Sequence, residues 1–268
     1  MIRVEDLPAA HPGRRLLTGR TPFFAAPTEP RCSFCAYVPR SWTPEARMSV
    51  LVAVHGTGRN VGALREGLIP FADRHDLIVV APLFPVGIDD PDDVDNYKTL
   101  DAHGIRFDLV LLEILEQVRV RWNARVDKVL LSGHSGGGQF AHRFLYLHPD
   151  RVSTVAVSAP GRVTPLDDTL AWPEGIGDTQ RRFGITVDPV AVARVPVLLV
   201  VGAEDDGRAD LAAMGDPGRS RPEELDRLAA SLTGHGTTIR KVVVPGVGHS
   251  AAGTQPPIVD FFTGLLAG

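Results

Sequence analysis

The stretch that decides the fold is Val129-Leu130-Leu131-Ser132-Gly133-His134-Ser135-Gly136-Gly137-Gly138-Gln139-Phe140. It opens with a short apolar run, which predicts a buried β-strand. A glycine-rich turn follows, and aromatic residues four positions apart, Phe140 and Phe144, then predict an amphipathic helix. The stretch therefore predicts a strand, a sharp turn and a helix, with Ser135 at the turn.

A serine at the tip of such a turn is expected to adopt a strained backbone conformation, and Gly133 and Gly137 leave room for the strand and the helix to approach each other. The hydroxyl of Ser135 then points away from the sheet. The backbone N–H of Gly136 lies at the start of the helix, where unpaired N–H groups favour a developing negative charge. A G-x-S-x-G string is weak evidence alone, and its place between a strand and a helix gives it weight. We predict Ser135 as a nucleophile and Gly136 as one donor of an oxyanion hole.

Two further side chains are expected at the same edge of the sheet. Asp205 follows the apolar run 197–201, and His249 follows the predicted strand 239–244. The carboxyl ends of parallel strands gather at one edge, so both residues are expected near Ser135. An imidazole can take the proton of a serine hydroxyl and return it to a leaving group, and a buried carboxylate fixes the tautomer of that imidazole. We predict His249 as the base and Asp205 as the acid that orients it.

The identity of the acid leaves two alternatives. Glu204 and Asp206 flank Asp205 and carry carboxylates at the same strand end. The spacing from Gly202, which ends the strand, favours Asp205.

The order serine, aspartate, histidine, each on a loop after a strand, resembles the α/β-hydrolase superfamily from about Val50 to the C-terminus. The loop His55-Gly56-Thr57-Gly58 and the small insertion described below resemble its serine esterase and depolymerase-like branch. The resemblance implies an α/β fold with a doubly wound, mostly parallel eight-stranded sheet and helices on both faces.

The loop after the predicted strand 50–54 has two interpretations. Its glycines form G-x-G-x-x-x-G between a strand and a helix, which resembles a dinucleotide-binding turn. Such a site usually has an acidic residue at the end of the next strand, whereas here that strand ends in Ala81-Pro82. We therefore favour a catalytic loop, in which the backbone N–H of Thr57 is the second oxyanion-hole donor.

One α/β-hydrolase domain over residues 1–268 is expected, since the length and the 44% hydrophobic residues suffice for one large core. Residues 162–192 lack clear periodicity, which is typical of a lid or binding insertion. Trp172 and Phe183 within it are candidates for an apolar wall that faces the substrate, and His134 is a candidate to line the substrate pocket.

The charge and composition of the chain limit the classes of molecule that it is expected to bind. A net charge of −4 without a basic run gives no sign of nucleic-acid or anionic-membrane binding, and no apolar segment predicts membrane spanning or export. We expect a cytoplasmic protein that acts on a small molecule, with no cofactor and no metal. Cys32 and Cys35 lie in a strand-like pattern and are interpreted as packed thiols, and the acidic loop 89–95 as a solvated loop.

These residues predict a serine hydrolase that cleaves a carboxylic ester through an acyl-enzyme. An amidase or an acyltransferase would need only a different pocket around the same residues. A hydrolase fold that binds a small ligand without turnover is a further alternative. The sequence leaves the particular substrate and the oligomeric state open.

Overall fold

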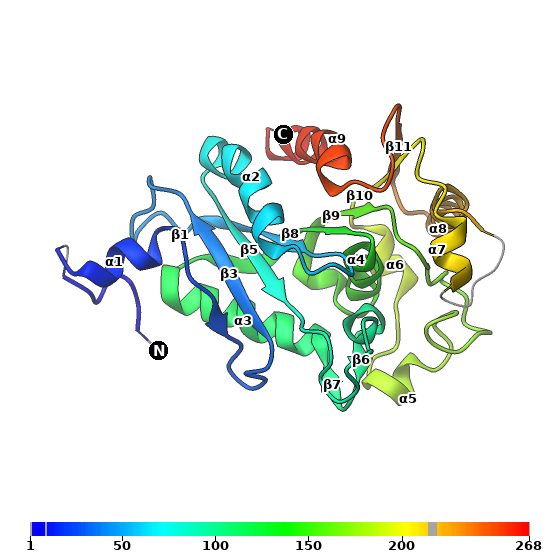
Figure 1. The fold of residues 1–268 in the computed structure, drawn as a ribbon, viewed down its shortest axis with the longest axis horizontal. Helices are drawn as coiled ribbons and strands as arrows, with labels where there is room; N and C mark the ends of the chain where they lie inside the picture. The colour runs from blue at the N-terminus through cyan, green and yellow to red at the C-terminus, as the bar shows by residue number, and fades with distance from the viewer. Residues whose placement is uncertain (1, 9, 214–218, 268) are drawn as a thin grey trace. The chain divides into compact units, whose positions relative to one another are not determined.

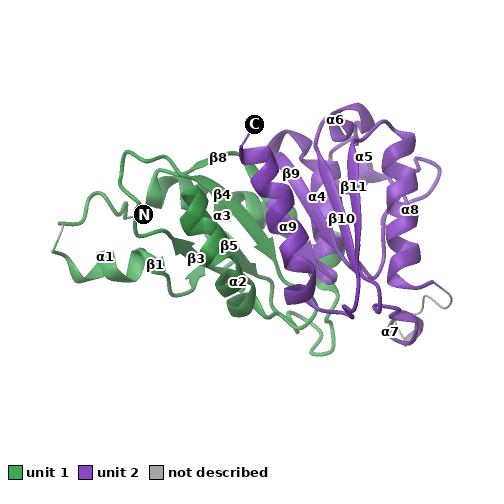
Figure 2. Ribbon diagram, turned by 90° about the horizontal axis from the view of Figure 1, so that it is seen from above, with its two compact units in different colours: residues 1–130 green, residues 131–268 purple. Residues whose placement is uncertain are grey.

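The computed structural model describes residues 2–8, 10–213 and 219–267. The chain divides into two compact units, Met1–Leu130 and Leu131–Gly268 (Figure 2). The expectation of one domain concerns how these units combine and stays a prediction.

Within the described residues, unit 1 contains four helices, one of them a 3-10 helix, and seven strands, and an eighth strand begins in it. Figure 1 shows these elements from blue to green in chain order. In chain order they are α1 (Pro12–Leu17), β1 (Gly19–Arg20), β2 (Phe24–Ala25), β3 (Ser33–Val38), β4 (Ser49–Val54), α2 (Val61–His75), β5 (Leu77–Leu83), the 3-10 helix η1 (Asn96–Thr99), β6 (Asp101–Ala102), β7 (Ile105–Arg106), α3 (Phe107–Trp122) and β8 (Arg125–His134).

The sheet of unit 1 has the strand order β1-β3-β5-β4-β8, with β2 beside β3. β4 and β5 pair in parallel, with Val50 opposite Ile78, whereas β3 runs antiparallel to β5, with Cys35 opposite Ala81. The apolar runs of β4 and β5 are almost wholly buried, as expected for strands covered on both faces. Helix α2 packs against β5 and β3.

Unit 2 begins within β8 and ends with the helix α9 (Figure 1). Its further elements are α4 (Gly136–Leu147), the 3-10 helix η2 (Pro149–Arg151), β9 (Val152–Ser158), α5 (Thr179–Phe183), α6 (Pro189–Ala193), β10 (Val197–Gly202), α7 (Arg208–Ala213), α8 (Arg221–Gly234), β11 (Ile239–Val244) and α9 (Ala251–Leu266). The strand order is β8-β9-β10-β11, and β10 pairs in parallel with both neighbours. Helix α4 packs on β9, and α8 and α9 pack on β10.

The predicted fold class is confirmed: a mostly parallel sheet with eight strands along one path and helices packed against it. The strand that leads to the turn of Ser135 is longer than its apolar run, because β8 starts at Arg125. None of the helices in the described part of the chain combines the length and the apolar composition that a membrane crossing requires.

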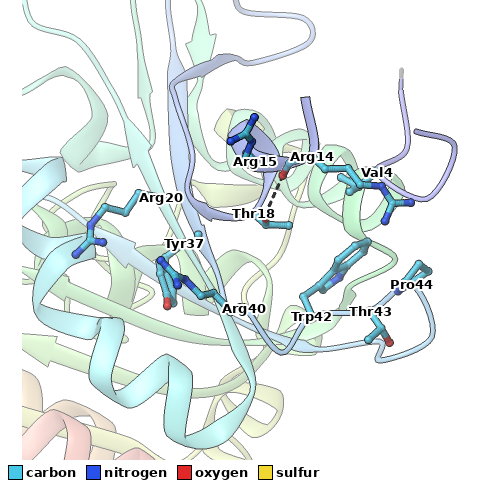
Figure 3. A pocket seen from close by; sticks show the side chains of 11 residues that line it. Val4, Arg14, Arg15, Thr18, Arg20, Tyr37, Arg40, Trp42, Thr43 and Pro44 are labelled. Atoms are coloured by element: carbon cyan, nitrogen blue, oxygen red, sulfur yellow. Dashed lines mark hydrogen bonds between the residues drawn. The ribbon is translucent and has the colours of Figure 1, made fainter. Parts of the chain in front are cut away.

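The N-terminal arm of unit 1 encloses a cavity of about 770 Å³ with α1 and the end of β3 (Figure 3). Arg14 fixes the arm because its Nε donates to the carbonyl of Leu7 at 2.8 Å. Trp42 forms part of the wall, and its ring N–H donates to the carbonyl of Trp122 at 3.0 Å. The arm, which has no clear pattern in the sequence, is thus held by side-chain contacts.

The two cysteines are buried and free, which confirms their interpretation as packed thiols. Burial raises the pKa of the Cys32 thiol to about 12, so it stays protonated and unreactive at neutral pH. Across the described ranges, no group of three or more His, Cys, Asp or Glu side chains is placed to hold a metal ion.

Candidate active site

Ser135 occupies the turn between β8 and α4 with φ 57° and ψ −116°. This conformation is outside the regions that a residue with a Cβ normally adopts, and holding it costs about 1–3 kcal/mol. Hydrogen bonds on both sides of the turn fix it: the N–H of Ser135 donates to the carbonyl of Ser158 at 2.8 Å, and the N–H of Gln139 donates to the carbonyl of Ser135 at 3.1 Å. The strained turn predicted from the glycine pattern is therefore present.

Two glycines are required near the turn because other backbone atoms approach them closely. A Cβ on Gly133 would overlap the carbonyl group of Gly137, and one on Gly138 would lie 2.8 Å from the carbonyl oxygen of Ser158. Backbone atoms on both sides cannot give way without moving the strand or the helix. The role predicted for Gly133 is confirmed.

Asp205 and His249 meet at the ends of the neighbouring parallel strands β10 and β11. The Asp205 Oδ2 lies 2.7 Å from His249 Nδ1. The two loops are joined by the N–H of Glu204, which donates to the carbonyl of Val247 at 2.9 Å. Gly202 permits this contact because a Cβ there would overlap the same carbonyl. The register of the strands thus sets the position of the histidine on the carboxylate.

The two alternative acids lie elsewhere. Asp206 is exposed and accepts a hydrogen bond from Arg208 at 3.1 Å. Glu204 is exposed as well. Of the three neighbouring carboxylates, only Asp205 is hydrogen-bonded to the imidazole among the described residues.

A buried arginine holds the other side of Asp205. Arg221 Nη1 donates to Asp205 Oδ1 at 3.0 Å, and the side chains of Arg221 and Asp205 are 5% and 1% exposed. Burial alone would raise the pKa of Asp205, but its hydrogen bond with His249 and the charges of His249 and Arg221 lower that pKa below its usual range. Asp205 is therefore a carboxylate at neutral pH.

His134 extends this cluster toward the turn. Its ring centroid is 4.8 Å from that of His249, and its Nδ1 is 2.9 Å from the Ser158 hydroxyl, which in turn is 2.8 Å from that of Thr254. Burial, with a smaller contribution from the charge of His249, lowers the pKa of His134 to about 3. The ring of His134, next to Ser135, is therefore neutral.

The structure brings the three predicted residues together to different degrees. Asp205 and His249 are hydrogen-bonded, and the His249 ring contacts the residue that precedes Ser135. Within the described residues, the Ser135 hydroxyl itself makes no hydrogen bond. About a third of the His249 side chain is exposed, so the imidazole is open to a ligand. Hydrogen bonds of catalytic groups are often long without substrate and shorten when it binds.

The loop that carries Thr57 belongs to unit 1. Arg59 Nη1 donates to the carbonyl of Thr57 at 2.7 Å, and the buried His55 accepts a hydrogen bond from the N–H of Phe84 at 3.0 Å. Burial lowers the pKa of His55 to about 3, so it is a neutral structural group. The loop is ordered by side chains, and the role of the Thr57 N–H as an oxyanion donor stays a prediction.

Trp172 and Phe183 lie inside the insertion 162–192. They are 4% and 6% exposed, and their ring centroids are 5.0 Å apart in an edge-to-face contact. The segment contains α5 and the start of α6. In this structure the two aromatic rings stabilise the insertion, and their contact with a substrate stays a prediction.

Sequence reasoning missed Arg221, Ser158 and Thr254. The contact of Arg221 spans 16 positions to Asp205 and depends on where α8 begins. The two hydroxyl residues lie on β9 and α9 and carry no local pattern. The capping motif of Ser220 and Glu223 marks the start of α8 in the sequence, but the burial of Arg221 against Asp205 leaves no signal there.

The fold of this chain is similar to those of several solved structures. No protein-family model matches the chain, and no curated protein sequence matches it. Among solved structures, a poly(3-hydroxybutyrate) depolymerase, LpqC, from Bordetella parapertussis is 26% identical, with TM-score 0.73 over 93% of this chain and 94% of that chain. Poly(aspartic acid) hydrolase-1 from Sphingomonas sp. KT-1 is 22% identical, with TM-score 0.73 over 91% and 98%.

An S-formylglutathione hydrolase from Agrobacterium tumefaciens is similar in fold, with 20% identity and TM-score 0.63 over 88% of this chain and 89% of that chain. These structures are similar in fold to this chain over most of its length. By its fold, this protein is a member of the α/β-hydrolase superfamily.

Proposed function

We propose that this protein is a serine hydrolase that cleaves a carboxylic ester of a small molecule through an acyl-enzyme. The observation that carries the proposal is the 2.7 Å contact between Asp205 and His249, which lies beside the strained turn of Ser135. The similar structures support it, since two of them are hydrolases and one is a depolymerase.

In the first half of the reaction, Ser135 Oγ attacks the ester carbonyl and His249 Nε2 takes its proton. Asp205 accepts the Nδ1–H of His249, which leaves Nε2 free as the acceptor and stabilises the imidazolium. The N–H of Gly136 donates to the oxyanion, with the N–H of Thr57 predicted as the second donor. Collapse breaks the carbon–oxygen bond, and the alcohol leaves with the proton from His249.

In the second half, a water molecule gives its proton to His249 Nε2 and attacks the acyl carbonyl. The tetrahedral intermediate collapses, the proton returns to Ser135 Oγ, and the carboxylic acid is released. Each half-reaction uses the same base and the same donors, so no cofactor is required.

Hydrolysis of p-nitrophenyl esters of increasing acyl length tests the proposal. We expect turnover by the wild type and its loss in Ser135→Ala, which keeps the fold. A parallel series of p-nitroanilides distinguishes an amidase, and added alcohols distinguish an acyltransferase. If the wild type hydrolyses none of these and is not labelled by a fluorophosphonate, the proposal is wrong and the chain is a binding protein.

A further inference from the structure

We propose that Arg221 is a positioning residue for the active site: it holds the Asp205 carboxylate in the orientation that His249 requires and thereby sets the lower pH limit of activity. The inference rests on the proposed serine hydrolase function. The Arg221 guanidinium is hydrogen-bonded to Asp205, and its proposed effect passes through that carboxylate.

Among the described residues, each oxygen of the Asp205 carboxylate has one hydrogen-bond partner. His249 Nδ1 lies 2.7 Å from Oδ2, and Arg221 Nη1 lies 3.0 Å from Oδ1. With both oxygens occupied, rotation of the carboxylate about its Cβ–Cγ bond would break one of the two contacts. Charge-assisted hydrogen bonds of this kind are roughly twice as strong as neutral ones. Arg221 therefore fixes the plane in which Asp205 meets the imidazole.

The chain around Arg221 is built for this contact. Ser220 and Glu223 form a capping box at the start of α8, and the N–H of Arg221 donates to the carbonyl of Asp206 at 3.0 Å. Gly207 has φ +64°, and a Cβ there would overlap the Arg221 guanidinium. The start of α8, the bond to the Asp206 carbonyl and the absence of a Cβ at Gly207 together hold the Arg221 guanidinium against Asp205.

The charge of Arg221 also bears on protonation. Arg221 from α8 and His249 after β11 face Asp205, His134 at the end of β8 faces His249, and the nearby Asp206 and Arg208 are exposed and paired with each other. A buried positive charge beside the Asp205–His249 pair opposes uptake of a further proton by that pair. Removing it makes the coupled pair take up a proton at a higher pH.

The test is the rate of Ser135 labelling by a fluorophosphonate as a function of pH, with the labelled fraction measured by intact mass. In Arg221→Met, we expect a rate constant about 10- to 100-fold lower than in the wild type. We also expect the acidic limb of the profile to move up by about half to one pH unit. Arg221→Lys, which keeps the charge, should retain the position of the limb.

Gly207→Ala provides a second variant, since it displaces the guanidinium without removing it, and should slow labelling as well. Arg240→Gln is the control, because its guanidinium is exposed on β11 and its removal should leave rate and limb unchanged. If the Arg221 variants lose labelled fraction while the remaining molecules react at the wild-type rate with the wild-type limb, Arg221 is only structural and the inference is wrong. A wild type that is not labelled at Ser135 overturns the proposed function instead.

Discussion

Among its described residues, unit 2 buries two arginines, and only one of them bonds a residue of the candidate active site. Arg221 is 4% exposed and faces a carboxylate, Asp205. Arg143, on α4, is 2% exposed and donates to neutral oxygens, those of Thr164 at 2.8 Å and Gln139 at 3.3 Å. His249 lies near Arg221 and His142 lies near Arg143, but only His249 is open to solvent.

The histidine near Arg143 is wholly enclosed. His142 Nδ1 lies 2.8 Å from the Gly138 carbonyl, and His142 Nε2 accepts from the N–H of Thr164 at 3.0 Å. Both ring nitrogens are therefore used by backbone groups, and burial lowers the pKa of His142 to about 3. In contrast, His249 uses Nδ1 for Asp205 and is a third exposed. The cluster around His142 has no ring nitrogen left to accept a proton, and it anchors the insertion 162–192. The cluster around His249 has such a nitrogen and can do acid–base chemistry.

The largest expected effect comes from replacing His249 by alanine, and the same replacement at His142 provides the contrast. His249→Ala should lower ester hydrolysis by about 10⁴-fold while the free energy of unfolding changes by about 1 kcal/mol or less. His142→Ala should do the reverse, with activity per folded molecule kept and stability reduced. Steady-state kinetics and urea unfolding of both variants check this, and equal losses of activity in the two would end the distinction.

Removing the scaffold arginine is expected to act on stability alone. Arg143→Met leaves buried oxygens of Thr164 and Gln139 without their donor, which should reduce the free energy of unfolding by about 2–4 kcal/mol. The exposed Arg240→Met is the control and should change it by about 0.5 kcal/mol or less. A stability of Arg143→Met equal to that of the control contradicts the anchoring role.

Stability should fall with acid because buried histidines are neutral in the folded state. His55, His134 and His142 have pKa values lowered to about 3, against about 6.5 when unfolded. Between these values the unfolded chain binds more protons, so each histidine lowers stability by about 1.4 kcal/mol per pH unit as the pH falls below about 6.5. Asp205, whose pKa is lowered, contributes only below its ordinary value of 3.8. Urea unfolding from pH 7 to 5 measures how the free energy of unfolding changes with pH, and His142→Gln should reduce this slope by about a third. An unchanged slope would mean that His142 is not neutral in the folded state.

The smallest expected effect concerns the backbone strain at Ser135. Ser135→Gly should abolish activity and raise the free energy of unfolding by about 1 kcal/mol over Ser135→Ala, since glycine adopts φ 57° without steric conflict. Thermal unfolding of the two variants measures the difference. A less stable glycine variant would show that the turn is not strained.

Much of the fold could be predicted because the parallel strands are apolar on both faces. The continuous runs of β4 and β10 have no other stable place than the centre of a sheet, and the observed strands, Ser49–Val54 and Val197–Gly202, extend the predicted ones by one residue. Asp205 and His249 followed from their places after such strands. The short helices α5, α6 and α7 have five or six residues each and cannot show a helical period, so they were not predicted.

What the sequence could not supply are the partners of the predicted residues. Arg221 reaches Asp205 only because Gly207 lacks a Cβ and because α8 starts at Arg221. The neutral state of His134 depends on burial, which arises from packing of β9 and α9 around β8 rather than from any neighbour in the chain.

The most direct test of the central claim is whether Ser135, Asp205 and His249 act as one unit. Residues that share one step are not additive, so the triple variant Ser135→Ala, Asp205→Asn, His249→Ala should be no less active than Ser135→Ala or His249→Ala alone, on the p-nitrophenyl ester that the wild type cleaves fastest. Losses that multiply from one variant to the next would show three independent residues and contradict the account.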